Sequence, residues 1–118
     1  MNQFRIEVSH GASGERIVKL SGPFTLRDVF EFQTLVRSES APVTILDMSE
    51  VPYMDSGALG SLLGMHVSCQ KDSRRYGIVG MSDRLQTMLR VAGVNGILVS
   101  FDTLSSAQGA LTTRSQAL

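Results

Sequence analysis

The sequence predicts an α/β fold: a single small domain with a mixed, mostly parallel β-sheet and about four helices. Two alternating segments open the chain, and compact apolar runs then alternate with helical patterns through its last two thirds. No linker, repeat or low-complexity block divides the 118 residues. We therefore expect one domain over residues 1–111 and a flexible tail over 112–118.

The first two strands are predicted to form a hairpin. FRIEVSH, residues 4–10, alternates apolar and polar residues, and ERIVKLSG, residues 15–22, follows the turn-forming GASG. This hairpin adds an antiparallel pair to a sheet whose other strands are joined by right-handed crossovers.

A helical period begins after the second strand. Thr25 with Asp28 resembles a capping box, which predicts a helix from about 26 to 38. Its apolar stripe is expected to comprise Leu26, Val29, Phe30 and Val36. We expect the phenylalanines of the strands and of this helix to lie in the core.

Three later apolar runs are typical of strands covered on both faces: VTILDM (43–48), YGIVGM (76–81) and GILVSF (96–101). Between the last two, Ser82 is predicted to cap a helix that ends at Gly93. Asp102 is predicted to cap a final short helix over 103–111.

The remaining helix, which begins near residue 56, has an unusual composition. No residue from Ser56 to Gln70 is charged, although charged residues make up 19% of the chain. At 3.6 residues per turn its core face carries Ala58, Leu59, Leu62, Leu63, Met65, His66 and Cys69. The opposite face carries only small uncharged residues: Gly57, Gly60, Ser61, Gly64 and Ser68.

Each helical glycine costs about 0.5–1 kcal/mol relative to alanine, so something should offset the loss. Either another element of the same domain lies close to the glycines, or a partner docks on a flat face. The sequence leaves both explanations open.

Ser56 follows Asp55 at the start of this helix. Either side chain could simply cap the free backbone N–H groups. A phosphate on Ser56 would meet the same N–H groups and the positive end of the helix dipole.

Composition excludes several function classes. Eleven basic residues balance eleven acidic ones, and the most basic cluster is interrupted by an acidic residue, so we expect no direct nucleic-acid partner. The single Cys69 allows no intrachain disulfide. The chain has no secretory signal pattern and no apolar run long enough to span a membrane, which favours a cytoplasmic protein.

Catalytic and metal-binding patterns are also missing. MDSGA is not a nucleophile elbow, and His66 lies ten residues beyond Ser56, about 15 Å along the same helix. One cysteine and two separated histidines give no metal-ligand spacing, and no phosphate-binding loop precedes a helix. We therefore expect a protein that is not an enzyme and uses no metal or cofactor, with His66 and Cys69 packed in the core.

The order VTILDMS, VPYMDSGALGSLL, YGIVGM and SDRLQTMLRVAGV resembles a STAS domain of the bacterial anti-sigma factor antagonist type. The resemblance covers nearly the whole chain and is strongest over residues 43–101. In that family the loop after the third strand commonly reads Asp-Ser-Ser-Gly-Leu-Gly. This sequence keeps Asp55, Ser56, Leu59 and Gly60 in the matching places.

The resemblance implies a partner-switching regulator. An anti-sigma factor that is also a serine kinase would bind the unmodified protein and release it after phosphorylating Ser56, and a serine phosphatase would reset the switch. The implied partner-binding residues are Asp55, Ser56, Gly57, Gly60, Ser61 and Gly64. Gly57 and Ala58 depart from the usual Ser-Gly, and SGPFTL lacks the acidic residue that commonly follows the glycine.

Two alternatives remain from the sequence. One is a module that senses a nucleotide or another small ligand, as some members of the wider family have been linked to such sensing. The other is a scaffold of a larger signalling complex that is never phosphorylated.

Overall fold

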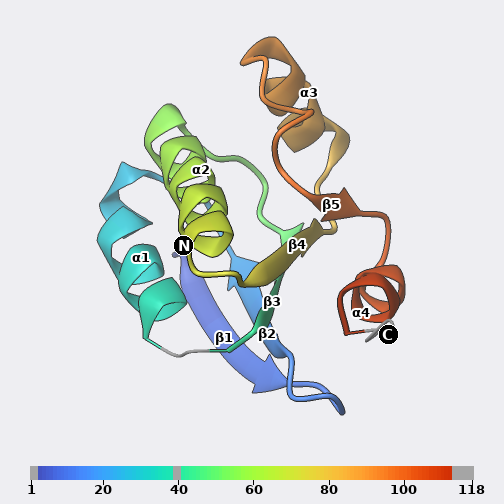
Figure 1. Ribbon diagram of the computed structural model, residues 1–118. Helices are drawn as coiled ribbons and strands as arrows, with labels where there is room; N and C mark the ends of the chain where they lie inside the picture. The colour runs from blue at the N-terminus through green and yellow to red at the C-terminus, as the bar shows by residue number, and fades with distance from the viewer. Residues whose placement is uncertain (1–2, 39–40, 113–118) are drawn as a thin grey trace.

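The computed structural model describes residues 3–38 and 41–112 and confirms the predicted fold class (Figure 1). The elements are β1 (Arg5–His10), β2 (Arg16–Ser21), the 3₁₀ turn η1 (Leu26–Asp28), α1 (Val29–Arg37), β3 (Val43–Glu50), α2 (Ser56–Lys71), β4 (Arg75–Val79), α3 (Asp83–Val91), β5 (Ser100–Phe101) and α4 (Leu104–Thr112). The expected tail lies outside the described residues, except for Thr112, which ends α4. No helix in the described ranges is long and apolar enough to cross a membrane.

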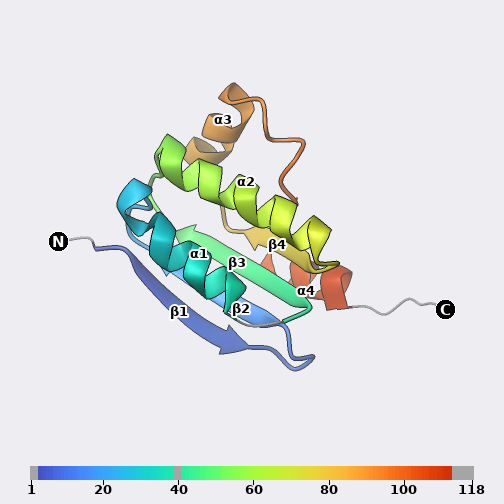
Figure 2. The same ribbon diagram turned by 60° about the vertical axis from the view of Figure 1, so that its left-hand side comes forward.

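The five strands lie in the order β1-β2-β3-β4-β5. The predicted hairpin is confirmed, because β1 and β2 pair antiparallel while the remaining neighbours pair parallel. Helices α1 and α2 lie side by side over one face of the sheet, and α4 packs on the other face (Figure 2). The sheet is therefore covered on both faces along its central strands.

The alternation of side chains along β3 explains the two cores. Leu46 and Met48 join the large cluster beneath α1 and α2, whereas Val43 and Ile45 point to the opposite face and meet α4. A strand buried on both faces does not alternate apolar with polar residues, which is why VTILDM is mostly apolar on both faces.

The apolar stripe predicted for the first helix is wrong in two places. Leu26 is 67% exposed and Phe30 is 80% exposed, while Phe32 and Val36 face the core. At 100° per residue Phe30 lies 120° around α1 from Val36, whereas Phe32 lies only 40° from it, so the predicted stripe is too wide; Leu26 lies in the η1 turn before α1.

The segment GILVSF is a strand only at its last two residues, Ser100 and Phe101. Turn hydrogen bonds precede them, with the N–H of Ile97 donating to the Val94 carbonyl at 3.0 Å. The Leu98 side chain is nevertheless buried. In this segment the apolar run indicates buried side chains and not an extended backbone.

The predicted helix ends have mixed outcomes. Ser82 caps α3 by accepting a hydrogen bond from Leu85 N at 3.2 Å, and Gly93 ends that helix with φ +76°. Asp102 does not cap α4, because the Oγ1 atom of Thr103 accepts the N–H of Ser106 at 3.0 Å. The cap lies one residue later than predicted.

Arg16 is a fully buried cation that connects β2, β3 and the end of α1. Its guanidinium donates to the carbonyls of Leu35 and Val36, each at 3.0 Å, and to Thr44 Oγ1 at 3.2 Å. The last turn of a helix leaves carbonyls without an intrahelical partner, and Arg16 shares these two with Ser38, which donates to Leu35 O, and Arg74, which donates to Val36 O.

Replacing Arg16 should therefore be costly. Arg16→Met keeps an apolar stem but removes the guanidinium bonds to Leu35 O, Val36 O and Thr44 Oγ1. Ser38 and Arg74 still donate to the two carbonyls, so the loss is that of the buried charge-assisted bonds, and we expect the free energy of unfolding to fall by roughly 2–4 kcal/mol in urea titrations. Arg75→Met is the matched control, because the exposed Arg75 also reaches a helix end, donating to Leu111 O at 2.9 Å. Water can replace that bond, so a control loss as large as the Arg16 loss would contradict this account.

Candidate functional site

One carboxylate organises the loop between β3 and α2. Asp55 Oδ1 accepts a hydrogen bond from Ala58 N at 2.9 Å, which caps α2, and Oδ2 accepts one from Leu26 N at 3.0 Å, which caps η1. Two backbone hydrogen bonds hold the same loop: Phe24 N donates to Tyr53 O at 3.0 Å, and Asp55 N donates to Phe24 O at 3.2 Å. The starts of both helices are thus fixed to each other.

These contacts also determine the charge of Asp55. The backbone N–H of Ala58 and then that of Leu26 lower the pKa of the carboxyl below its ordinary value, because both bonds favour the ionised form. The side chain therefore carries a full negative charge beside the start of α2 at neutral pH.

Ser56 is the first residue of α2, and its side chain is exposed. Of the two capping possibilities that the sequence left open, the structure selects Asp55. The Ser56 hydroxyl is therefore not needed as the cap. It lies at the positive end of the helix dipole, on the surface.

The glycines of α2 separate into two kinds. A Cβ at Gly57 would lie 2.7 Å from Leu26 Cδ1 and 3.1 Å from Leu26 Cα, so another element of the same domain requires this glycine. A Cβ at Gly60 or Gly64 would meet nothing within 4 Å, and both residues are exposed. The internal explanation holds for Gly57 alone.

Ser61 does not lie on the open face, contrary to the helical-wheel prediction. It is 3% exposed, and its hydroxyl donates to Ala58 O at 2.7 Å. Helix α1 packs beside α2 on this side and widens the buried arc of the helix. Ser61 is therefore inaccessible to a partner, and Gly57 is covered in part by Leu26.

Before the exposed last residues Gln70 and Lys71, the exposed residues of α2 form a narrow row spaced by four, four and three residues: Ser56, Gly60, Gly64 and Val67. We call this row the α2 ridge. Val67 is 59% exposed and was not singled out in the sequence, although an apolar residue outside the predicted core face is the signal that could have identified it.

Two further residues beside the loop escaped the sequence reasoning. The Arg84 guanidinium carbon lies 6.0 Å from the centroid of the Tyr53 ring, and Tyr53 is 37% exposed. Tyr53 stands two residues before Asp55, so this pair lies beside the start of the α2 ridge.

His66 and Cys69 are structural, as predicted. His66 Nδ1 lies 2.7 Å from the hydroxyl of Tyr76, and the two rings meet edge to face. Cys69 is 3% exposed, and burial raises the pKa of its thiol.

The fold and this site can be compared with known proteins. Residues 9–100 match the family described as "Mlab, STAS domain". The chain belongs to the STAS domain family. The resemblance drawn from the sequence is therefore confirmed.

Individual relatives agree with this assignment. The anti-sigma-B factor antagonist of Listeria monocytogenes is 29% identical over 75 residues, which are 64% of this chain and 66% of that protein. The crystal structure of an anti-sigma factor antagonist from Mycobacterium paratuberculosis has a TM-score of 0.82 at 18% identity and covers 94% of this chain and 96% of its own. The phosphorylated form of the Bacillus cell fate determinant SpoIIAA has a TM-score of 0.69 at 14% identity, covering 90% and 98% respectively.

The double cap of this STAS domain predicts a pH-dependent stability. Asp55→Ala removes the α2 cap and the bond to Leu26 N, although the predicted capping box of Thr25 and Asp28 remains at η1, and should lower the free energy of unfolding by about 1–3 kcal/mol at pH 7. Because the folded pKa is depressed, the stabilisation is complete above the ordinary Asp pKa of about 3.9 and disappears as the pH falls through the folded pKa. Urea titrations should show the gap between wild type and variant narrowing below about pH 4, and a constant gap would contradict the capping role.

The two kinds of glycine predict opposite effects of alanine. Gly57→Ala should destabilise the domain by about 1–3 kcal/mol, because the new methyl group collides with Leu26. Gly60→Ala and Gly64→Ala should each stabilise it by about 0.5–1 kcal/mol, because helix propensity improves where space is open. A melting temperature that is higher for Gly57→Ala than for the wild type would contradict the predicted collision with Leu26.

Proposed function

We propose that this protein is an anti-sigma factor antagonist that docks through the α2 ridge onto an anti-sigma factor, which is also the serine kinase for Ser56. One observation carries the proposal. Asp55 performs the capping, which leaves an exposed serine hydroxyl at the start of a ridge whose glycines face open space. The protein then acts as a cytoplasmic regulator rather than as an enzyme.

The α2 ridge suits a docking surface because it is nearly free of side chains. Gly60 and Gly64 allow the backbone of a partner to approach the helix closely, and Val67 adds exposed apolar surface at the far end. The two glycines lower helix stability by roughly 0.5–1 kcal/mol each without serving any contact inside the domain. Partner binding is the function that offsets this loss.

Phosphorylation of Ser56 would make this neutral surface negatively charged. The phosphate adds about −1.5 to −2 charges where α2 has no charged residue before Lys71. The ionised Asp55 carboxylate stands one residue away, so the two like charges add to the cost of desolvating the surface. Docking is disfavoured until a serine phosphatase removes the phosphate.

The relatives support this mechanism in different ways. The Listeria relative is named an anti-sigma-B factor antagonist, and the Bacillus relative is described in a phosphorylated form. A protein of this fold can therefore accept a phosphate. Asp55, Ser56, Leu59 and Gly60 carry the family pattern to this chain.

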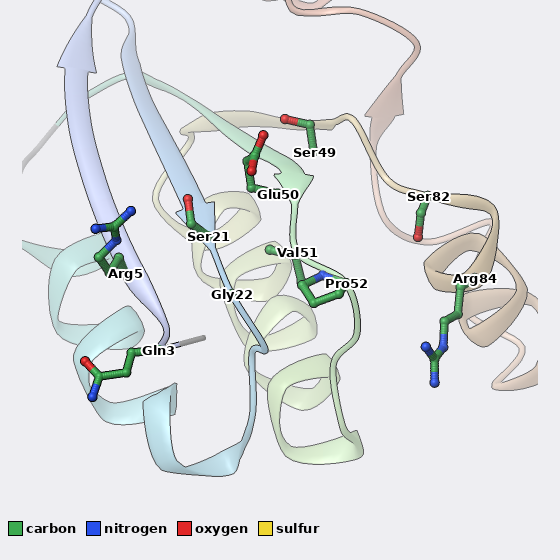
Figure 3. A pocket seen from close by; sticks show the side chains of 10 residues that line it. All are labelled: Gln3, Arg5, Ser21, Gly22, Ser49, Glu50, Val51, Pro52, Ser82 and Arg84. Atoms are coloured by element: carbon green, nitrogen blue, oxygen red, sulfur yellow. The ribbon is translucent and has the colours of Figure 1, made fainter. Parts of the chain in front are cut away.

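A small-ligand sensor is the second candidate, and a pocket of about 820 Å³ favours it (Figure 3). The pocket lies near the carboxyl ends of β2 and β3, where α/β sheets commonly bind ligands, and Arg5 and Arg84 contribute positive charge. Figure 3 shows these two side chains on opposite sides of the pocket, without converging on one point. The pocket therefore supports ligand binding less specifically than the α2 ridge supports partner docking.

The decisive experiment incubates the protein with ATP and the anti-sigma kinase encoded nearest to it, followed by intact-mass spectrometry. We expect the wild type to gain one phosphate and Ser56→Ala to gain none. Ser61→Ala is the matched control on the same helix and should still be phosphorylated, because Ser61 is buried. An active kinase that leaves the folded wild type unmodified would overturn the Ser56 switch.

Docking is measured separately, by calorimetry with the same kinase in the absence of ATP. Gly60→Arg should abolish binding, and Gly60→Ala should weaken it while raising stability. Gly93→Arg is not a usable control because its φ is positive, so Thr87→Arg on the exposed side of α3 serves instead. Unchanged affinity for Gly60→Arg would exclude the α2 ridge as the docking surface.

A further inference from the structure

The two edges of the sheet are unequal. β5 is an edge strand of two residues, whereas β1 is an edge strand of six residues that pairs only with β2 among the described strands. Figure 2 shows β1 at the rim of the sheet, beside α1. The outward N–H and C=O groups of a long edge strand form a template for another strand.

Apolar side chains flank this edge on the α1 side. A groove of about 480 Å³ is lined by Ile6 and Val8 of β1 and by Phe30 and Leu35 of α1. Val8 is 41% exposed and Phe30 is 80% exposed, which is unusual for residues of this size. An added strand would cover part of this surface.

The other side of the sheet supplies a charge pattern. Glu7 on β1 lies opposite Lys19 on β2, and Lys19 lies opposite Asp47 on β3. The row therefore alternates negative, positive and negative from the edge inward. Opposite charges on neighbouring strands stabilise a sheet, so the position beyond Glu7 is suited to a positive side chain.

We propose that β1 pairs antiparallel with β1 of a second copy of this chain, with Ile6 facing Ile6 on the two-fold axis. In this register Arg5 of each copy lies opposite Glu7 of the other, which extends the alternating row on both sides. Phe4, whose ring stacks on Phe24 of its own copy, lies opposite Val8 of the other copy, so the exposed valine gains an apolar neighbour. The pairing is isologous, as two-fold symmetry requires.

Charge selects this register against its neighbours. The side chains stay on their own faces only when the register shifts by two residues at a time. Such a shift in one direction places Glu7 opposite Glu7, and in the other direction it places Arg5 opposite Arg5. Like charges directly opposite each other are destabilising.

Sedimentation-equilibrium analysis of the full chain tests the proposal through a charge swap. We expect wild type to dimerise, and Arg5→Glu or Glu7→Arg to weaken the dimer at least tenfold. The double variant Arg5→Glu with Glu7→Arg should restore it, because both cross-strand pairs are re-formed with reversed polarity. A wild type that stays monomeric at about 1 mM, or a double variant weaker than both single variants, would overturn the proposal.

Disulfide trapping tests the register independently. Ile6→Cys should oxidise to a covalent dimer, because directly opposite residues have Cα atoms about 4.5–5.5 Å apart. Val8→Cys is the matched control on the same strand face and should not, since its two copies would lie about 13 Å apart along the strands. Trapping at position 8 but not at 6 would overturn the register. If Ile6→Cys fails to fold, the charge swap decides alone.

The dimer proposal is independent of the docking mechanism. β1 and α1 line the pairing edge, whereas the α2 ridge belongs to another element. Ser56→Ala should therefore leave the dimer intact, and Arg5→Glu should leave phosphorylation of Ser56 intact.

Discussion

The site depends on the Asp55 carboxylate, because this one side chain accepts hydrogen bonds from backbone N–H groups at the starts of both η1 and α2. It cannot bond both Leu26 N and Ala58 N unless η1 and α2 begin side by side. That proximity in turn requires Gly57, since any larger residue would collide with Leu26. Ser56, placed between the capping aspartate and this glycine, is held at the surface by contacts that its own hydroxyl does not make.

The burial pattern of α2 follows from its neighbours. The sheet covers one side of the helix and α1 widens the buried arc as far as Ser61. Before the last two residues of α2, the exposed positions are those of the narrow α2 ridge. Charged side chains would stabilise an ordinary exposed ridge, yet this one carries glycine at two of its four positions. Stability has thus been lost at the positions where a partner could use the space.

Much of the fold could be predicted from the sequence, because patterns of neighbouring residues determine most of its strands and helices. Alternation gave the hairpin, continuous apolar runs gave the two-sided strands, and Ser82 and Gly93 marked the ends of α3. One error arose where a tertiary contact decides, because α1 buries Ser61. Another arose from too wide a stripe, because Phe30 lies 120° around α1 from the buried Val36. The bond between Asp55 and Leu26 joins residues 29 positions apart, so no local pattern could show it.

The placement of Ser56 also determines what kind of switch a phosphate can operate. Negative charge at the first turn of a helix is favourable for that helix, so a phosphate on Ser56 has no reason to unfold α2. The Ala58 N–H is already bonded to Asp55, so the phosphate cannot be neutralised by that donor and keeps its charge exposed toward a partner. Phosphorylation at this position would therefore change the surface and leave the fold intact, and in the proposed switch the energy would come from the partner interface.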